Sequence, residues 1–402
     1  IDEVHVEIGA FYLPVIGNIE EIEKGMAGKR TDLYQQMLKE LIEQAQYMDA
    51  HGYYGMGTTE HHFHIEGEEV STNPVLLDLY IGMQTKNLKV GQLGNVLPAH
   101  NPVRLAEDIA MVDQMTGGRA FAGFARGYQP RWVATLGQQI DGMAKEPELG
   151  AQAYDNLKRE LYEDHFEIIM KAWGKDTFSH KSKFWEIPPA NTYWATHDVT
   201  RKYGQGVDDK GYLTEIGIVP STYNKRMPDL FQPFSVSERS IVWALQNKVT
   251  PITIITDVPT AQEHIRAAQK AAADSGTTYR MGMTREIVVA DTDEEARAIA
   301  SRGGAYVWCN FFQPFGFNAA ITKKGEDPFA IKNDFETIEE RGLVICGSPD
   351  TVKRKLEKLF KDLPCDYFWL FTYNGLIPQN KMMRHFELLT EKVLPHFTDK
   401  IR

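Results

Sequence analysis

The chain has 402 residues, of which 43% are hydrophobic and 25% are charged. This composition is typical of a soluble globular protein with a large core and excludes a disordered chain. The formal net charge of -11 is opposite in sign to the clustered Lys and Arg that bind nucleic acids or anionic membranes, so neither is an expected partner.

No uninterrupted apolar stretch approaches the roughly 20 residues of a membrane-spanning helix. The chain also lacks a basic start followed by an apolar segment, so we expect a cytoplasmic protein. The three cysteines, Cys309, Cys346 and Cys365, are too widely spaced for a disulfide framework or a zinc pair. They are expected to be buried thiols.

Strand-like and helical segments alternate along almost the whole chain, which predicts successive βα units. A strand over residues 4–11 is followed by a helix over residues 32–51, whose apolar residues recur at helical spacing and which Gly52 closes. Further strands are expected at 52–57, 88–97, 119–125, 230–236, 252–256, 285–290 and 367–371, and helices at 102–115, 240–246, 260–273, 293–308, 350–361 and 380–393. These repeats predict an α/β fold, a (β/α)8 TIM-like barrel, with residues 1–402 as a single domain.

Two segments interrupt this alternation, at residues 137–150 and 184–227. Both are rich in Gly, Pro, Asp and Asn and are too long for ordinary connectors. Ordered loops of this length are usually lids or binding loops, so we expect them as insertions at the C-terminal face of the barrel. The second contains two strand-like pieces, at 193–195 and 215–219.

Three imidazoles and a carboxylate gather in Glu60-His61-His62-Phe63-His64, directly after a predicted strand. In α/β barrels the carboxyl ends of the strands form the catalytic face. In an extended chain only His62 and His64 share a side, and no third protein ligand for a metal is evident, so no metal is expected. Purely structural histidines remain an alternative, but an acid/base histidine oriented by Glu60 or a neighbour fits the residues better.

Two further segments suggest a phosphate-bearing cofactor. Arg126 and Gly127 end a predicted strand, where an arginine can bind a phosphate through two parallel hydrogen bonds. Ser237 and Ser240 lie at the start of a predicted helix, whose free N–H groups form an anion site. A rim ion pair and an ordinary N-cap are the alternatives.

Several motifs together resemble the bacterial luciferase-like flavin-dependent monooxygenases. The resemblance is strong over residues 8–137, returns at 234–244, and is faint near 346–349 and in the last strand. The motifs are Glu60-His61-His62-Phe63, Asn95-Val96-Leu97-Pro98, His100-Asn101-Pro102-Val103-Arg104-Leu105-Ala106-Glu107-Asp108, Asp113-Gln114-Met115-Thr116-Gly117-Gly118-Arg119 and Ala125-Arg126-Gly127.

The resemblance implies a TIM-like barrel that binds FMN, with His61 at the position of the family's catalytic histidine. The other matching positions are those that hold the FMN phosphate, namely Arg126, Ser237 and Ser240, one that faces the isoalloxazine ring, Phe11, and a non-proline cis peptide beneath it, Leu93-Gly94. Ala125 replaces a reactive cysteine of the light-emitting enzymes, and they lack the 184–227 insertion. The substrate therefore stays open among long-chain aldehydes, ketones, terpenoids, aromatics and other natural products.

The implied activity is a monooxygenase in which reduced FMN and O2 form a C4a-peroxyflavin that oxygenates a small organic substrate. No Gly-x-Gly-x-x-Gly fingerprint follows a predicted strand, so a separate NAD(P)H:flavin reductase is expected. The family also implies a homodimer. Three alternatives remain: an F420-dependent hydride-transfer oxidoreductase, a metal-dependent barrel hydrolase using His61, His62 and Glu60, and a non-catalytic flavin carrier.

Overall fold

The computed structural model describes residues 5–373 and 375–402. Eight parallel strands close a barrel, because β10 pairs with both β9 and β12, while β12 pairs with β1. The strands are β1 (Glu7–Leu13), β2 (Gly55–Thr58), β3 (Lys89–Gln92), β5 (Ala120–Ala125), β8 (Asp229–Ser235), β9 (Thr250–Thr253), β10 (Gly282–Val289) and β12 (Tyr367–Tyr373). The predicted (β/α)8 TIM-like barrel is therefore confirmed. Of the predicted strand over 4–11, residue 4 lies outside the described residues.

Large aromatic rings fill the barrel. Trp369 contacts Phe121 and Phe231 with ring centroids 5.5 and 5.3 Å apart. Glycines make room for these rings: a Cβ at Gly9 would lie 2.6 Å from Cζ3 of Trp369, and one at Gly91 would lie 2.3 Å from Cδ2 of Phe121. Aromatic rings thus fill the interior, and a side chain at either glycine would overlap with them.

Apart from the helix expected at 293–308, the predicted helices are present with shifts at their ends. The helix predicted at 102–115 is α4 (Pro102–Met115), and the Asn101 side chain accepts hydrogen bonds from the N–H groups of Val103 and Arg104 as its N-cap. The others are α2 (Thr31–Ala50), α9 (Glu238–Gln246), α10 (Val258–Ser275), α14 (Pro349–Asp362) and α15 (Gln379–Leu388). Elements that the sequence analysis did not predict include α1 (Ile19–Glu23), α3 (Pro74–Gly82) and α13 (Phe335–Glu340), while the apolar run that ends at Gly347 forms β11 (Val344–Gly347).

Two predictions in the barrel part need correction. The strand expected at 88–97 is interrupted, with β3 ending at Gln92 and β4 covering only Asn95–Val96. The helix expected at 293–308 ends early, because α11 (Asp293–Ser301) stops before Gly303 and the chain resumes in α12 (Gly304–Val307). Two successive glycines lower helix propensity there.

The chain divides into two compact units. The first contains the barrel and comprises the described residues up to Asn95, with Phe121–Gly123 and Leu230–Arg402. The second comprises Val96–Ala120 and Phe124–Asp229. Its longest helix, α7 (Ala151–Gly174), was not predicted; Trp173 Nε1 on α7 donates to the carbonyl of Ala106 on α4 at 3.0 Å.

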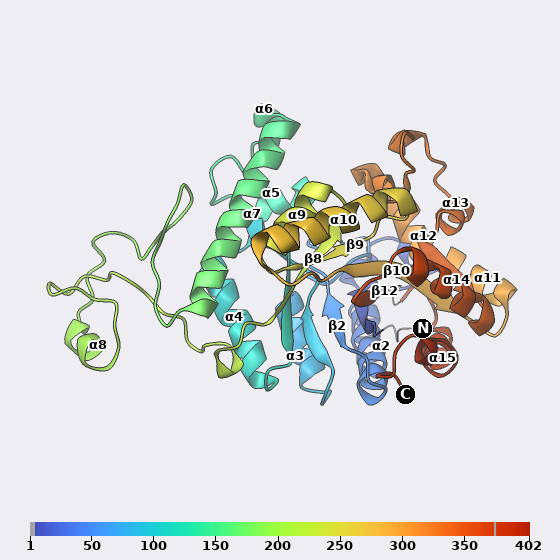
Figure 1. The fold of residues 1–402 in the computed structure, drawn as a ribbon, viewed down its shortest axis with the longest axis horizontal. Helices are drawn as coiled ribbons and strands as arrows, with labels where there is room; N and C mark the ends of the chain where they lie inside the picture. The colour runs from blue at the N-terminus through green and yellow to red at the C-terminus, as the bar shows by residue number, and fades with distance from the viewer. Residues whose placement is uncertain (1–4, 374) are drawn as a thin grey trace. The chain divides into compact units, whose positions relative to one another are not determined.

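The two insertions belong to this second unit. In the 137–150 segment, which ends in α6 (Glu146–Leu149), Ile140 and Met143 pack in one apolar cluster with Leu157 of α7. The 184–227 segment leads away from α7 and carries the short helix α8 (His197–Tyr203) (Figure 1).

The strands predicted at 193–195 and 215–219 are wrong. Only isolated bridges form there, Tyr193 with Tyr212 and Phe178 with Ile216. A two-stranded sheet forms instead from β6 (His180–Lys181) and β7 (Glu186–Ile187). Short segments of this kind bury too little apolar surface to form a stable sheet by themselves.

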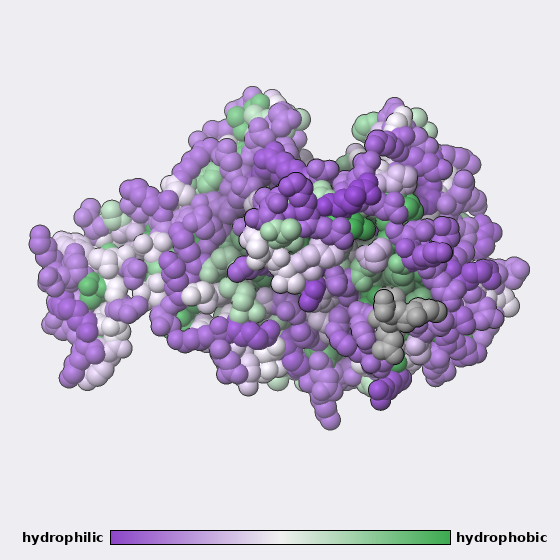
Figure 2. Space-filling model, viewed as in Figure 1, coloured by the Kyte–Doolittle hydropathy of each residue, from purple (hydrophilic) through white to green (hydrophobic). Residues whose placement is uncertain are grey.

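The face shown in Figure 2 is mainly hydrophilic, with apolar residues in separate patches. Within the described part of the chain, no helix combines the length and apolar character needed to cross a membrane.

Candidate functional site

Three phenylalanines from three strands meet near the carboxyl end of the barrel. Phe11 of β1 lies opposite Phe371 of β12 in the strand register, and their ring centroids are 5.2 Å apart. Phe234 of β8 contacts both, with centroids at 5.2 and 5.5 Å. Phe11 is fully buried, and it forms an apolar ring cluster with the other two, which suits an aromatic ligand better than a charged one. We call these three residues the phenylalanine cluster.

His61 follows β2 and is nearly buried, with 9% of its side chain exposed. Its Nε2 lies 3.1 Å from Oε1 of Glu69, whose side chain is 1% exposed. The second carboxylate oxygen of Glu69 lies 3.5 Å from Nδ1 of His64, and this nitrogen is 2.9 Å from the carbonyl oxygen of Glu68. One buried carboxylate therefore contacts two imidazoles.

Glu60, which the sequence analysis favoured as the partner of His61, contacts a different imidazole. Its Oε1 lies 2.8 Å from Nε2 of His62. The sequence analysis missed Glu69, although the pair Glu68-Glu69 follows the histidines closely and could have been noticed. The predicted acid/base histidine thus has an acidic neighbour, and this neighbour is Glu69.

The imidazole of His61 is held in its neutral form. Burial, with smaller contributions from the imidazoles of His64 and His62, keeps the pKa of His61 well below its ordinary value. A neutral imidazole at neutral pH can accept a proton, which is the property required of a general base.

A cavity of about 170 Å³ opens beside this histidine. His61, His64 and Glu69 form its polar side, and Phe63, Tyr34 and Ile16 contribute ring and apolar surface. Within residues 5–373 and 375–402, no three His, Cys, Asp or Glu residues are arranged to hold a metal ion.

The peptide between Leu93 and Gly94 is cis, as the sequence analysis predicted. It follows β3 directly, and the Leu93 side chain occupies the space that a Cβ on Gly57 would need, at 2.4 Å from Leu93 Cδ1.

A buried polar network lies beside this peptide. Gln92 Nε2 donates to Oδ2 of Asp78 at 2.6 Å, and Asn95 Nδ2 donates to Oε1 of Gln92 at 2.8 Å. Burial raises the pKa of Asp78 well above its ordinary value. The residues on either side of Leu93 and Gly94 are therefore fixed by hydrogen bonds inside the protein.

Ser237 and Ser240 form the start of α9, immediately after β8. The Ser237 side chain accepts from the N–H of Ser240 at 3.2 Å, and its hydroxyl donates to that of Ser240 at 2.9 Å. Ser237 is exposed at the N-terminus of α9, where two hydroxyls and the helix N–H groups suit an anion.

Arg126 follows β5 and belongs to the second unit. Its Nη1 donates to Oδ1 of Asp155 at 3.1 Å, and 32% of its side chain is exposed. The guanidinium is therefore both ion-paired and reachable by solvent. Gly127 comes next with a φ of +78°, and a Cβ there would lie 2.6 Å from Cγ2 of Val133.

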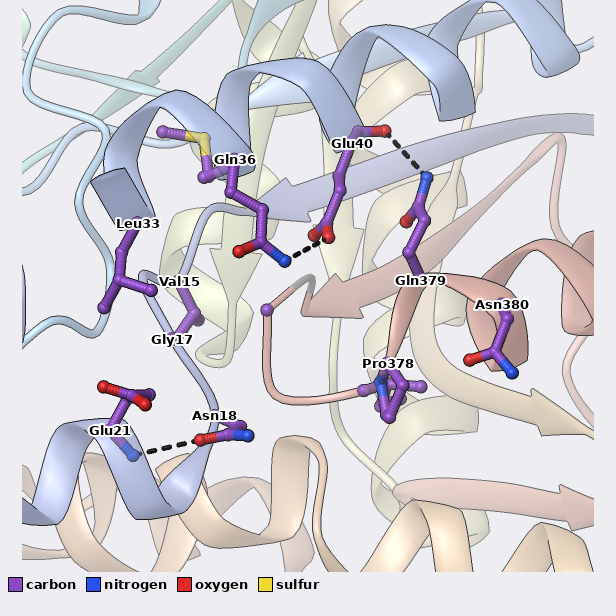
Figure 3. Close-up of a pocket in the computed structure, with 13 residues that line it drawn as sticks. Val15, Gly17, Asn18, Glu21, Leu33, Gln36, Glu40, Pro378, Gln379 and Asn380 are labelled. Atoms are coloured by element: carbon purple, nitrogen blue, oxygen red, sulfur yellow. Dashed lines mark hydrogen bonds between the residues drawn. The ribbon is translucent and has the colours of Figure 1, made fainter. Parts of the chain in front are cut away.

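The barrel unit has a second cavity of about 430 Å³, lined by α1, α2 and the segment leading into α15 (Figure 3). Glu40 and Gln36 point toward one another there, and Gln36 Nε2 donates to Oε1 of Glu40 at 2.8 Å. Burial raises the pKa of Glu40. None of the predicted site residues lines this cavity.

These residues fit a flavin mononucleotide. In the phenylalanine cluster, Phe234 is half-buried and offers apolar ring surface, and the N-terminus of α9 offers N–H groups and hydroxyls for a phosphate.

Comparison with known proteins agrees with this chemistry. The model of the family described as luciferase-like monooxygenase matches residues 25–208. The chain is 27% identical over 330 residues to 3,6-diketocamphane 1,6-monooxygenase of Pseudomonas putida, covering 80% of this chain and 82% of the relative. It is 31% identical over 340 residues to the uncharacterised protein y4wF of Sinorhizobium fredii (strain NBRC 101917 / NGR234), covering 83% and 84%.

Solved structures show the same fold. The oxygenating constituent of 3,6-diketocamphane monooxygenase from Pseudomonas putida, a type II Baeyer-Villiger monooxygenase in complex with FMN, aligns with a TM-score of 0.73 at 22% identity over 98% of both chains. An F420-dependent secondary alcohol dehydrogenase aligns with a TM-score of 0.64 at 12% identity over 98% of this chain and 100% of the other.

The chain therefore belongs to the luciferase-like flavin-dependent monooxygenases and is an enzyme of that class.

Proposed function

We propose that the protein uses reduced FMN and O2 to oxygenate a small apolar organic substrate, through a C4a-peroxyflavin. One oxygen atom enters the substrate, the other leaves as water, and FMN returns to its oxidised form. The observation that carries the proposal is His61, a buried and neutral imidazole at the carboxyl end of a barrel strand.

The flavin would supply the activation of oxygen. The chain's own residues would bind and orient the flavin and the substrate and would exclude water. The phenylalanine cluster would contact the flavin ring, and Ser237 and Ser240 would hold its phosphate at the start of α9. The role proposed for Arg126 of the second unit, as a cation for a phosphate, rests on its own partly exposed guanidinium. His61 would accept and return a proton. The ring contact of Phe11 with Phe234, the cap of Ser237 on Ser240 N and the partly exposed guanidinium of Arg126 support these roles.

A cyclic ketone is the substrate class to test first. The chain is similar over four fifths of its length to an enzyme whose name specifies a diketocamphane. An uncharged cyclic ketone also suits an apolar surface lined by aromatic rings, because its burial places no unpaired charge in an apolar environment.

We further propose that reduced FMN comes from a separate NAD(P)H:flavin reductase and that the protein works as a homodimer. Light scattering of the purified protein tests the second point. NADH oxidation by the purified chain alone, at the rate of substrate oxygenation, would contradict the first.

The decisive experiment supplies photoreduced FMN and ¹⁸O2 to the purified protein together with a panel of bicyclic ketones. We expect one ¹⁸O atom in the product by mass spectrometry, and its loss in the His61→Gln variant. Complete conversion of oxygen to hydrogen peroxide, with no labelled product from any substrate, would refute the proposal.

The F420-dependent reading has one specific observation in its favour, the fold shared with an F420-dependent dehydrogenase. Under that reading the protein would bind F420 more tightly than FMN and would oxidise or reduce its substrate without oxygen. Equilibrium binding of both cofactors separates the two functions.

A further inference from the structure

We propose that Glu69 is the positioning residue of His61: it fixes the imidazole tautomer with the proton on Nε2 and leaves Nδ1 as the basic nitrogen. This inference rests on the proposed function, in which His61 handles a proton. It concerns a residue that none of the sequence motifs includes.

The contact itself supplies the first argument. Oε1 of Glu69 lies 3.1 Å from Nε2 of His61, and both side chains are nearly buried, at 1% and 9% exposure. A carboxylate oxygen accepts and an imidazole N–H donates, so the proton of a neutral ring must lie on Nε2. In a site of low exposure this bond is stronger than it would be in water.

The backbone that carries Glu69 is anchored at three points. Gly67 O accepts from Ile16 N at 2.7 Å, Val70 N donates to Pro14 O at 2.9 Å, and Ser71 O accepts from the N–H of His61 at 2.8 Å. The last bond ties the segment to His61 directly. Carboxylate and imidazole are therefore held together by both main chain and side chain.

Glu69 also adopts an uncommon conformation. Its φ is +49°, in the left-handed region, which costs a non-glycine residue about 1 kcal/mol or more. Such residues cluster at sites where the surrounding structure enforces a particular arrangement. Here the enforced arrangement places one carboxylate against two imidazoles.

The second oxygen of Glu69 extends the arrangement to His64. That oxygen is 3.5 Å from His64 Nδ1, which donates to the carbonyl of Glu68 at 2.9 Å. Because His64 is held by a main-chain carbonyl, it restrains the carboxylate of Glu69. The charged and titratable groups near His61 include His62, His64, Glu60, Glu68 and Glu69, and Tyr34 lines the same cavity.

The test uses two variants. Glu69→Gln retains an acceptor oxygen of the same shape and removes the charge, while Glu69→Leu removes both. We expect kcat with the labelled-oxygen assay to fall roughly 10-fold or more in both, as part of the 10²–10⁴ that a general base contributes. The KM for substrate and the Kd for FMN should change less than about 3-fold, because only 1% of the Glu69 side chain is exposed to a ligand. The acid limb of the kcat profile should move to lower pH, since loss of the carboxylate makes His61 less basic.

A spectroscopic readout tests the contact without turnover. In protein with ¹⁵N-labelled histidine rings, long-range ¹H–¹⁵N spectra identify which nitrogen of His61 carries the proton; His61→Gln assigns the signals. We expect Nε2–H in the wild type and a mixture of tautomers in Glu69→Leu. Glu60→Gln is the matched control, because Glu60 is equally buried and contacts His62. This variant should change the signals of His62 and leave the signals of His61 unchanged.

The outcomes separate the two proposals. A wild-type protein that oxygenates no substrate refutes the proposed function, and the histidine spectra still decide the role of Glu69. Unchanged His61 signals in both Glu69 variants would overturn the inference. A parallel loss of stability and FMN affinity, with an unchanged pH profile, would overturn it as well by showing a purely structural role.

Discussion

Trp185 Nε1 donates a hydrogen bond to Nε2 of His165 at 2.8 Å. On the other side of the ring, Nδ1 of His165 donates to the carbonyl of Leu97 at 2.9 Å. His165 is completely buried, and burial lowers its pKa to about 4, so the ring stays neutral. The start of the 184–227 segment is therefore tied to α7 and to the residue after β4 through one neutral imidazole.

Replacement of Trp185 by Phe should destabilise this segment. The ring is retained and only the donor is lost, which leaves Nε2 of a buried histidine without its hydrogen bond at a cost of about 1–3 kcal/mol. We expect a lower urea midpoint and faster proteolysis within residues 184–227. Trp194→Phe is the control, because Trp194 is 45% exposed and donates to the side chain of Thr200 at 2.8 Å, where water can take over. Equal effects of both changes would contradict the prediction.

Glu286 should make the stability of the protein depend on pH. It is nearly buried, its Oε1 accepts from Gly304 N at 3.1 Å, and burial raises its pKa to about 8 from 4.5. Between these values the folded state binds a proton that the unfolded state lacks, so stability falls as pH rises, by about 1.4 kcal/mol per unit at most. Glu286→Gln retains the acceptor and should remove this loss, measured as unfolding free energy from pH 5 to 8.

A second variant tests the hydrogen bond that Glu286 accepts from Gly304. Glu286→Leu removes the acceptor of the Gly304 N–H and should be less stable than Glu286→Gln at every pH, by about 1–3 kcal/mol. The unfolding free energies of both variants should show the same flat pH dependence. A wild-type profile as flat as that of the variants would show that Glu286 does not change its protonation on unfolding.

Arg126→Ala should weaken binding of FMN more than binding of riboflavin, which lacks the phosphate. Loss of one charge-assisted contact corresponds to about 1.5–3 kcal/mol, or roughly 10- to 100-fold in Kd. Arg104→Ala is the control, since Arg104 is an exposed arginine of α4 whose nearest carboxylate oxygen is 3.8 Å away. Fluorescence titration measures both flavins. An equal loss for riboflavin and FMN would show that Arg126 does not contact the phosphate.

Gly91→Ala should disrupt barrel packing. The added Cβ would lie 2.3 Å from Cδ2 and 2.4 Å from the carbonyl oxygen of Phe121, and overpacking of this kind costs about 1–3 kcal/mol. Gly174→Ala, at the end of α7, meets nothing within 4 Å and should be neutral or slightly stabilising. Thermal unfolding of the two variants gives the comparison; a stable Gly91→Ala protein would mean that Phe121 can move aside.

Much of the fold follows from local signals in the sequence. The alternation of apolar strands with helices of 3.6-residue period predicted the barrel, and the helix predicted over 102–115 is present as α4. The cis peptide at Leu93 and Gly94 came from the resemblance and is present. By contrast, α7 was missed among the loop-like residues around it, and the strand-like pieces near Tyr193 and Ile216 found no partner strands.

The sequence by itself determined the barrel, the order of its strands and the family, because period, caps and motifs are properties of neighbouring residues. It also placed His61 at the end of a strand. Only the tertiary structure decided that Glu69 contacts His61, that Glu60 contacts His62, and that Phe11, Phe234 and Phe371 form one cluster. Contacts between segments depend on the direction and register of the backbone, and no local sequence pattern encodes these. A left-handed turn at one residue can reverse the backbone direction.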